Sequence, residues 1–161
     1  MKNKIIVILS LCFLSFSINE KVKIYKFALS KITSSKEYSL FVKSKKKYYI
    51  SNEVVSYTKL AQYFRSELEK SNPITEEEIV RDTNKKNLVD DNLLSLNIKK
   101  CSKVQINFSE IRNDIFFAEL IKSKEKTKHK EVYLGISYLY MFKITDNDEV
   151  ELIKTIELDN N

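Results

Sequence analysis

The sequence predicts an α+β protein in which a helical first half packs on a C-terminal antiparallel meander of about four strands. Apolar residues between positions 20 and 82 recur mainly at helical spacing, whereas residues 104–158 form strand-like segments separated by short polar turns. The expected helices precede the strands and do not alternate with them, which indicates an α+β class. One Gly and one Pro in the chain argue against folds that need many tight turns.

The 161 residues are expected to divide into a signal peptide, 1–17, and a single α+β domain, 18–161. Two lysines precede a run of twelve mostly apolar residues, which matches a secretory signal and is too short to span a membrane. Small serines at the end of the run predict cleavage between Ser17 and Ile18. We therefore expect export to the periplasm or the medium, with no transmembrane span left after cleavage.

Two alternatives for the first segment stay open. It could be a buried helix or strand of the domain, or it could carry a lipid anchor on Cys12. Leu11 argues against the anchor, because a small residue normally precedes a lipid-modified cysteine. After cleavage Cys101 is the remaining thiol, so we expect no intrachain disulfide and a buried cysteine side chain.

The first half begins with a helix predicted over residues 20–33. Its apolar residues have helical spacing: Val22, Tyr25, Ala28, Leu29 and Ile32. Residues 38–43 (YSLFVK) are typical of a strand, and residues 48–50 (YYI) of a second, shorter strand. A longer helix is expected over about 51–70, capped by the serine or asparagine at its start.

A third, short helix is predicted by the capping-box spacing of Thr75 and Glu78. Residues 83–92 form a polar connection around a lone Leu-Val pair. Residues 93–98 (LLSLNI) fit either a strand or a short helix, because the apolar run is too short to decide between them.

The C-terminal meander follows, and its helical cover is expected on one face of the sheet. The four predicted strands are 104–108, 115–122, 132–145 and 150–158. Polar turns join the first strand to the second and the third to the fourth, while a basic loop over 123–130 (SKEKTKHK) joins the second to the third.

Two stretches of the meander carry a family resemblance. VQINFSEIRNDIFFAELI (104–121) and YLYMFKITDNDEVELIKTIEL (138–158) both alternate an aromatic-rich strand with a short turn. Over 104–158 this pattern resembles small exported α+β proteins of unknown function from AT-rich bacteria. The resemblance implies a signal segment, a helical first half and a terminal meander, and it assigns no residue a role.

The third predicted strand has apolar residues on both faces, which a sheet covered on one side does not need. Leu139 and Met141 lie on the second face, beside Gly135 and near Tyr133. These four residues are a candidate partner surface, on which Gly135 would leave room for a ligand. The alternative, which we favour, is that the first helix and residues 83–98 cover both faces of the sheet.

The residues indicate no metal site, no cofactor site and no catalytic motif. A net charge of +6 supports weak attraction to anionic surfaces but does not indicate a nucleic-acid partner. His129 is the single histidine and sits in the basic loop. A hydrolase would need His129 beside a nucleophile, or a carboxylate pair from Glu110, Asp114 and Glu119.

The function that fits these observations is an exported or cell-envelope domain without catalytic activity. It would bind a protein or small ligand through its sheet. An inhibitor or immunity-type protein is a narrower alternative, and a small secreted hydrolase is an alternative of another class.

N-terminal sequencing of the exported product tests the first segment. Because the apolar run ends in small residues, the mature chain is expected to begin at Ile18. A product that begins at Met1, or at a lipid-modified Cys12, would contradict cleavage at this site.

Overall fold

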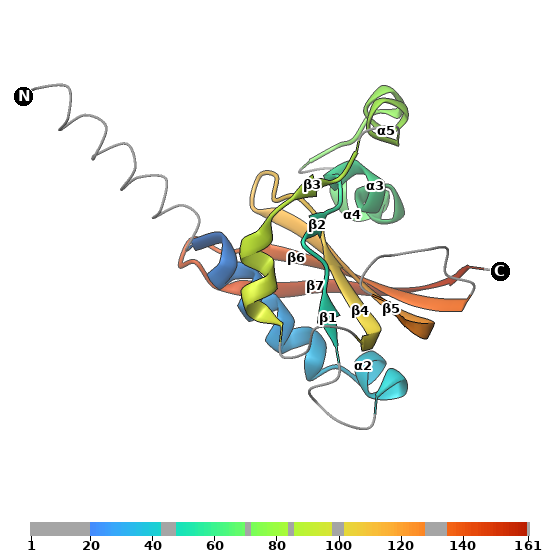
Figure 1. Cartoon of the computed structure of the whole chain (residues 1–161). Helices are drawn as coiled ribbons and strands as arrows, with labels where there is room; N and C mark the ends of the chain where they lie inside the picture. The colour runs from blue at the N-terminus through green and yellow to red at the C-terminus, as the bar shows by residue number, and fades with distance from the viewer. Residues whose placement is uncertain are drawn as a thin grey trace, which may run out of the picture.

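The computed structural model describes residues 20–42, 48–69, 72–83, 86–97, 102–127 and 135–160. It begins with the predicted first helix over 20–33 and continues through short helices into a long sheet (Figure 1). The later elements are α2 (Lys36–Phe41), β1 (Tyr49–Ile50), β2 (Glu53–Val54), α3 (Tyr57–Ala61), η1 (Gln62–Phe64), α4 (Arg65–Leu68), α5 (Glu76–Thr83), β3 (Leu88–Val89), η2 (Asp91–Leu96), β4 (Ser102–Phe108), β5 (Ile115–Thr127), β6 (Gly135–Ile144) and β7 (Val150–Asn160).

The main sheet has the strand order β1-β4-β5-β6-β7. Strands β4 to β7 are antiparallel neighbours, which confirms the α+β class and the predicted four-strand meander. β1 adds a fifth strand parallel to β4, and β2 pairs with β3 in a separate small ribbon. None of the helices in the described ranges combines the length and apolar character that crossing a membrane requires.

The central strands β5 and β6 are apolar on both faces. One face belongs to the larger core cluster through Phe116, Ala118, Leu120, Tyr138, Tyr140 and Phe142. The alternate residues belong to a second cluster through Ile115, Phe117, Leu139 and Met141. Because side chains alternate across a strand, the two clusters lie on opposite faces, and each face needs its own cover.

The first helix covers one face. The Tyr25 ring stacks on Phe108 with centroids 4.7 Å apart and meets Phe116 edge-on at 5.6 Å. Its buried hydroxyl donates a 2.8 Å hydrogen bond to the Ser109 carbonyl, so the polar end of the side chain is satisfied. Leu93 of η2 is buried in the same cluster.

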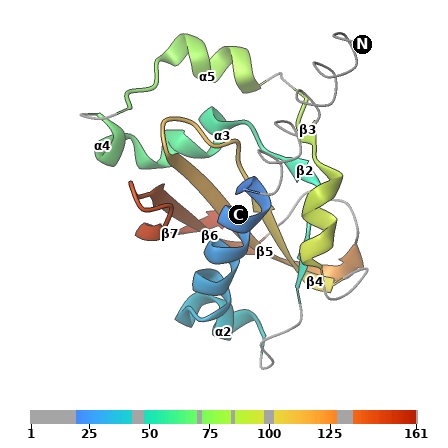
Figure 2. The same cartoon turned by 90° about the vertical axis from the view of Figure 1, so that its left-hand side faces the viewer.

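The consecutive segments α3, η1 and α4 cover the other face. Their buried apolar residues are Tyr57, Leu60, Ala61, Phe64 and Leu68. The Phe64 ring stacks on Phe117 at 5.2 Å, and Figure 2 shows the sheet between this cover and the first helix. The expectation of helices on one face was therefore wrong. The alternative of two covered faces is correct, but α3 and α4 supply the second cover, whereas Leu93, from the described part of 83–98, belongs to the first cluster.

Two predictions in the first half were wrong for local reasons. Residues 38–42, the described part of the predicted strand, are not a strand, because Ser35 caps helix α2 by accepting a 3.2 Å hydrogen bond from the Tyr38 amide. The expected helix from residue 51 starts only at Tyr57. The preceding backbone instead bonds to the end of β4, as in the 2.8 Å bond from the Val55 amide to the Phe108 carbonyl.

The later boundaries also differ in places. The polar connection over 83–92 contains β3, whose Leu-Val pair joins β2. In the ambiguous segment after it, residues 93–96 belong to the 3-10 helix η2. β5 extends to Thr127, so the expected basic loop begins as strand, with Thr127 opposite Ser102 of β4. Pairing with β4 thus extends a segment whose composition indicated a turn.

Substitution of Phe117 tests the second cover. Phe117 is fully buried between the rings of Tyr57 and Phe64, at centroid distances of 5.1 and 5.2 Å. Phe117→Ala is expected to lower the free energy of unfolding by about 3–5 kcal/mol, since it leaves a cavity. Chemical denaturation measures this, with Tyr63→Ala, at a 48% exposed site, as the control. A loss no larger than that of the control would contradict a packed second cover.

Candidate functional site

The predicted partner surface is not open in this fold. Leu139 is fully buried and Met141 is 3% exposed, and both pack under α3 and α4. Gly135 is the first residue of β6, while Tyr133 lies outside the described residues. The second apolar face is therefore explained by intramolecular packing, and the expectation that Leu139 and Met141 face a partner has to be corrected.

The other residues singled out from the sequence do not assemble into one site. Ser17, Ile18, Cys12 and His129 lie outside the described residues. The three candidate carboxylates occupy separate places: Glu110 lines a cleft, Asp114 is exposed in the turn before β5, and Glu119 is buried in the sheet. The structure therefore places the three carboxylates in different surroundings.

A buried polar row crosses from β4 to β5. Gln105 donates a 2.6 Å hydrogen bond to Asn107, which donates a 3.1 Å bond to the Glu119 carboxylate. All three residues are at most 9% exposed. Polar residues that alternate with apolar ones along a strand are ordinarily expected to face solvent, so sequence reasoning missed this row. Only the pairing of the two strands brings the groups together.

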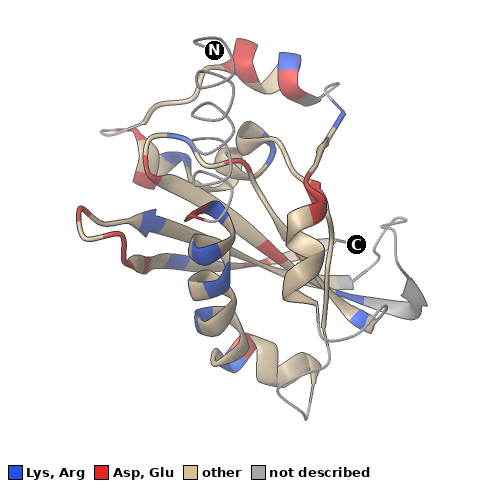
Figure 3. Ribbon diagram, turned by 60° about the vertical axis from the view of Figure 1, so that its left-hand side comes forward, with Lys and Arg blue, Asp and Glu red and all other residues tan. Residues whose placement is uncertain are grey.

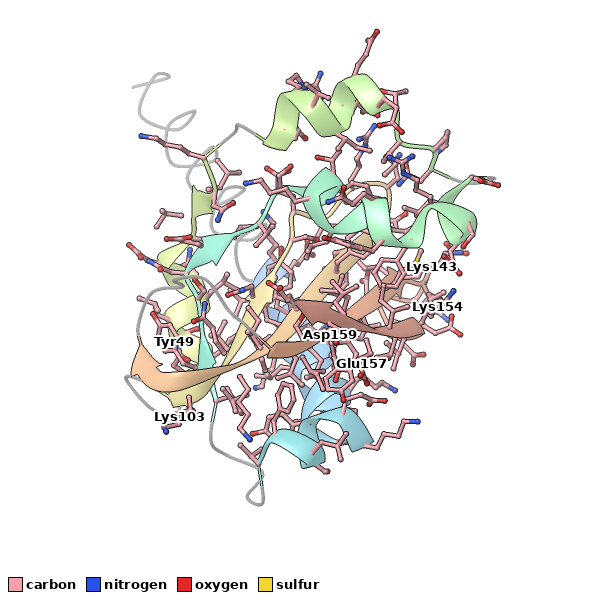
Figure 4. The ribbon with its side chains drawn as sticks, turned by 90° about the vertical axis from the view of Figure 1, so that its right-hand side faces the viewer. Tyr49, Lys103, Lys143, Lys154, Glu157 and Asp159 are labelled. Carbon is pink, nitrogen blue, oxygen red and sulfur yellow. The ribbon has the colours of Figure 1, made fainter. Side chains whose placement is uncertain are left out.

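The outer strand β7 is the open edge of the sheet. Among the described residues its one strand neighbour is β6, and Figure 4 shows Lys154, Glu157 and Asp159 along it. Lys154–Asn160 pair in continuous register with Gly135–Met141. The register shifts between Met141 and Phe142, which leaves Ile153 as the extra residue of the strand.

The surface around this edge combines apolar and acidic groups. Ile153 is 42% exposed and Leu152 is 36% exposed. Glu157 and Asp159 are both exposed and lie on one face of the strand, because they are two residues apart. On the other face Lys154 forms an ion pair with Glu67 of α4, which lowers the pKa of the Glu67 carboxyl.

A cleft of about 630 Å³ opens where the first helix, α3, α5, β3 and the β4–β5 connection meet. Its lining residues are Lys21, Tyr57, Arg81, Asp82, Leu88, Glu110, Ile111 and Arg112. Figure 3 shows basic residues along the first helix, and acidic residues at the start of α5. The cleft was not predicted, because its residues come from five segments spread over 92 positions of the chain, from 21 to 112.

Asp82 connects α5 to the start of α3. Its carboxylate accepts hydrogen bonds from the Thr58 hydroxyl at 2.8 Å and the Ser56 hydroxyl at 3.0 Å, and Arg81 lies 3.3 Å away. The Thr58 bond, together with those from Ser56 and Arg81, lowers the pKa of Asp82 despite its burial. This wall of the cleft therefore holds an ionised, fully engaged carboxylate.

Arg112 connects the other end of α5 to the floor of the cleft. Its guanidinium forms a 2.9 Å ion pair with Glu78 and lies 5.6 Å from the centre of the Tyr57 ring. Glu78 also completes the predicted capping box, accepting a 3.0 Å bond from the Thr75 amide. This bond and the Arg112 contact lower the pKa of Glu78, while burial raises the pKa of Tyr57 to about 12.

Substitution of Asp82 tests the α5 connection. Asp82→Asn is expected to lower the free energy of unfolding by about 1–3 kcal/mol at pH 7, because bonds to a charged acceptor are weakened. Since the pKa of Asp82 is lower in the folded state than its ordinary 3.8, its stabilisation is present above that value. The difference in unfolding free energy between the wild type and the variant should therefore shrink as the pH falls from 4 through the lowered folded-state pKa of Asp82. A denaturation series over pH measures it. Asp91→Asn, at an exposed position, is the control; a difference independent of pH would contradict the assignment.

Neither a protein-family model, nor a curated protein, nor a solved structure matches this chain. The resemblance to small exported proteins from AT-rich bacteria therefore stays a prediction. What the protein does must be inferred from its own surfaces, chiefly the outer edge of β7 and the charged cleft.

Proposed function

We propose that this protein is an exported, non-catalytic α+β domain that binds a protein partner through the outer edge of its sheet. The observation that carries the proposal is β7, a strand of eleven residues at the end of the sheet order. Export rests on the signal-like pattern of residues 1–17. The binding mode rests on the edge, because both faces of the central strands are already covered by helices.

An open edge strand offers backbone N–H and C=O groups to an incoming strand. Addition of a partner strand gains affinity from main-chain hydrogen bonds and specificity from alternate side chains. Lys154–Asn160 form seven residues in unbroken register with β6, which is long enough for such pairing. The proposed binding segment is therefore this part of β7, beyond the register shift at Ile153.

The side chains of β7 indicate the chemistry of the partner strand. Glu157 and Asp159 are exposed on the same face, so a partner with basic residues opposite them would be favoured. Exposed Leu152 and Ile153 favour apolar contacts near the register shift. An inhibitor or immunity-type protein is one form that such a partner-binding domain could take.

Lys154 and the register shift are also features by which proteins keep sheet edges from pairing. The ion pair of Lys154 with Glu67 directs that lysine toward α4 and not toward an incoming strand. If β7 is only an edge that is kept from pairing, Glu157 contacts no other chain. If β7 binds a partner strand, Glu157 lies against that strand, and this difference can be measured.

Site-specific photo-crosslinking tests this function. A photoreactive residue at Glu157, in the full chain made by its own cells, is expected to give one discrete crosslinked species. The same residue at Val80, which is 66% exposed on α5, serves as the control. Adding Asp159→Lys should reduce the crosslinked yield roughly fivefold, because it reverses the charge offered to a basic strand.

The folding of each variant is checked by its thermal midpoint. Equal yields at positions 157 and 80, or no crosslinked species at position 157, would overturn the proposal. A crosslinked product that consists of two copies of this chain would show that the β7 edge mediates self-association and does not bind a different protein.

A further inference from the structure

A second binding site is built into the cleft beside α5, independent of the β7 edge. We propose that the cleft binds an organic carboxylate that carries an apolar group next to the charge. Three basic residues from three elements line it: Lys21, Arg81 and Arg112. Its volume of about 630 Å³ lies within the range of small-molecule and peptide-end pockets.

The acidic groups around the cleft already have donors. Asp82 accepts hydrogen bonds from Ser56 and Thr58 and contacts Arg81. Glu78 accepts bonds from Arg112 and from the Thr75 amide. Glu110, the second carboxylate of the lining, accepts a 3.5 Å hydrogen bond from the Tyr57 amide. A cationic ligand would therefore compete with contacts that hold α5 in place, which argues against a cation as the occupant.

The basic groups, by contrast, keep donors to spare. A guanidinium has five N–H donors. Within the described ranges, the side chain of Arg81 contacts Asp82 through Nε, and Arg112 contacts Glu78 through one terminal nitrogen. Lys21 forms no ion pair with any described residue and is exposed at the cleft wall. The surplus of donors over acceptors favours an anion.

The orientation of Arg112 favours a planar anion. Its guanidinium pairs with the Glu78 carboxylate and lies 5.6 Å from the centre of the Tyr57 ring, so part of the side-chain entropy is already lost before a ligand binds. A carboxylate matches the paired donors of a guanidinium, which a point-charge lysine does not provide. The site therefore selects the shape of the anion as well as its charge.

Apolar side chains lie beside these donors. Leu88 lines the cleft and is 52% exposed, and Ile111 lines it from the β4–β5 connection. An apolar group attached to the carboxylate would cover this surface and gain hydrophobic free energy. Both the C-terminal end of a peptide and a free apolar organic acid have this chemistry.

Calorimetric titration of the full chain tests the proposal with matched probes. N-acetyl-leucine and a short peptide ending in leucine are each compared with their neutral C-terminal amides. Both carboxylates are expected to bind, and each amide should bind roughly tenfold more weakly, because it loses the charge-assisted bonds. If the peptide binds roughly tenfold more tightly than N-acetyl-leucine, the occupant is a peptide end; equal affinity assigns a free organic acid.

Variants link the binding to the cleft. Arg81→Gln and Lys21→Gln, both at exposed positions, are each expected to weaken carboxylate binding roughly fivefold. Arg65→Gln is the matched control. Arg65 of α4 pairs at 2.6 Å with Glu76 of α5, the helix that carries Arg81, but Arg65 does not line the cleft. If neither carboxylate binds when its concentration reaches about 10 mM, the proposal is wrong. Amides that bind equally well, or an Arg65→Gln effect as large as that of Arg81→Gln, would overturn it too. None of these results bears on crosslinking at Glu157.

Discussion

Strands β5 and β6 carry large apolar side chains on both faces, and the arrangement of the other elements depends on the need to bury both. Phe116 and Phe142 stack at 5.2 Å on one face, while Phe117 and Leu139 are fully buried on the other. A sheet of this kind is stable in water only if two layers cover it. The first helix supplies one layer, and the broken helix formed by α3, η1 and α4 supplies the other.

The two covers meet at one end of the sheet, and the cleft results from that meeting. Tyr25 fixes the first helix against Phe108 and the Ser109 carbonyl, which places Lys21 at the cleft wall. Tyr57 begins the second cover and contributes its ring to the floor. α5 is held over this junction by polar contacts instead of a buried apolar face, so its charged groups stay beside the opening.

The same constraint leaves the last strand different from its neighbours. Every described strand from β4 to β6 lies between two others, whereas β7 has one neighbour. Ile156 and Leu158 still pack partly against the second cluster, but Glu157 and Asp159 face solvent. The sheet therefore presents its backbone at an edge with an acidic character, while its broad faces are used within the molecule.

The sequence alone determined the α+β class, the first helix, the α5 capping box and the meander, because each depends on contacts between residues close along the chain. The sequence also indicated the second apolar face of the sheet. It did not identify the helices that cover this face, because periodicity shows that a face is buried but not which element buries it. Only the tertiary structure decided that α3 and α4 cover Leu139 and that Val55 pairs with β4. The tertiary structure also placed Lys21 and Arg112 in one cleft. Long-range packing and strand pairing decide such contacts, and they override the local preference of a segment for helix or strand.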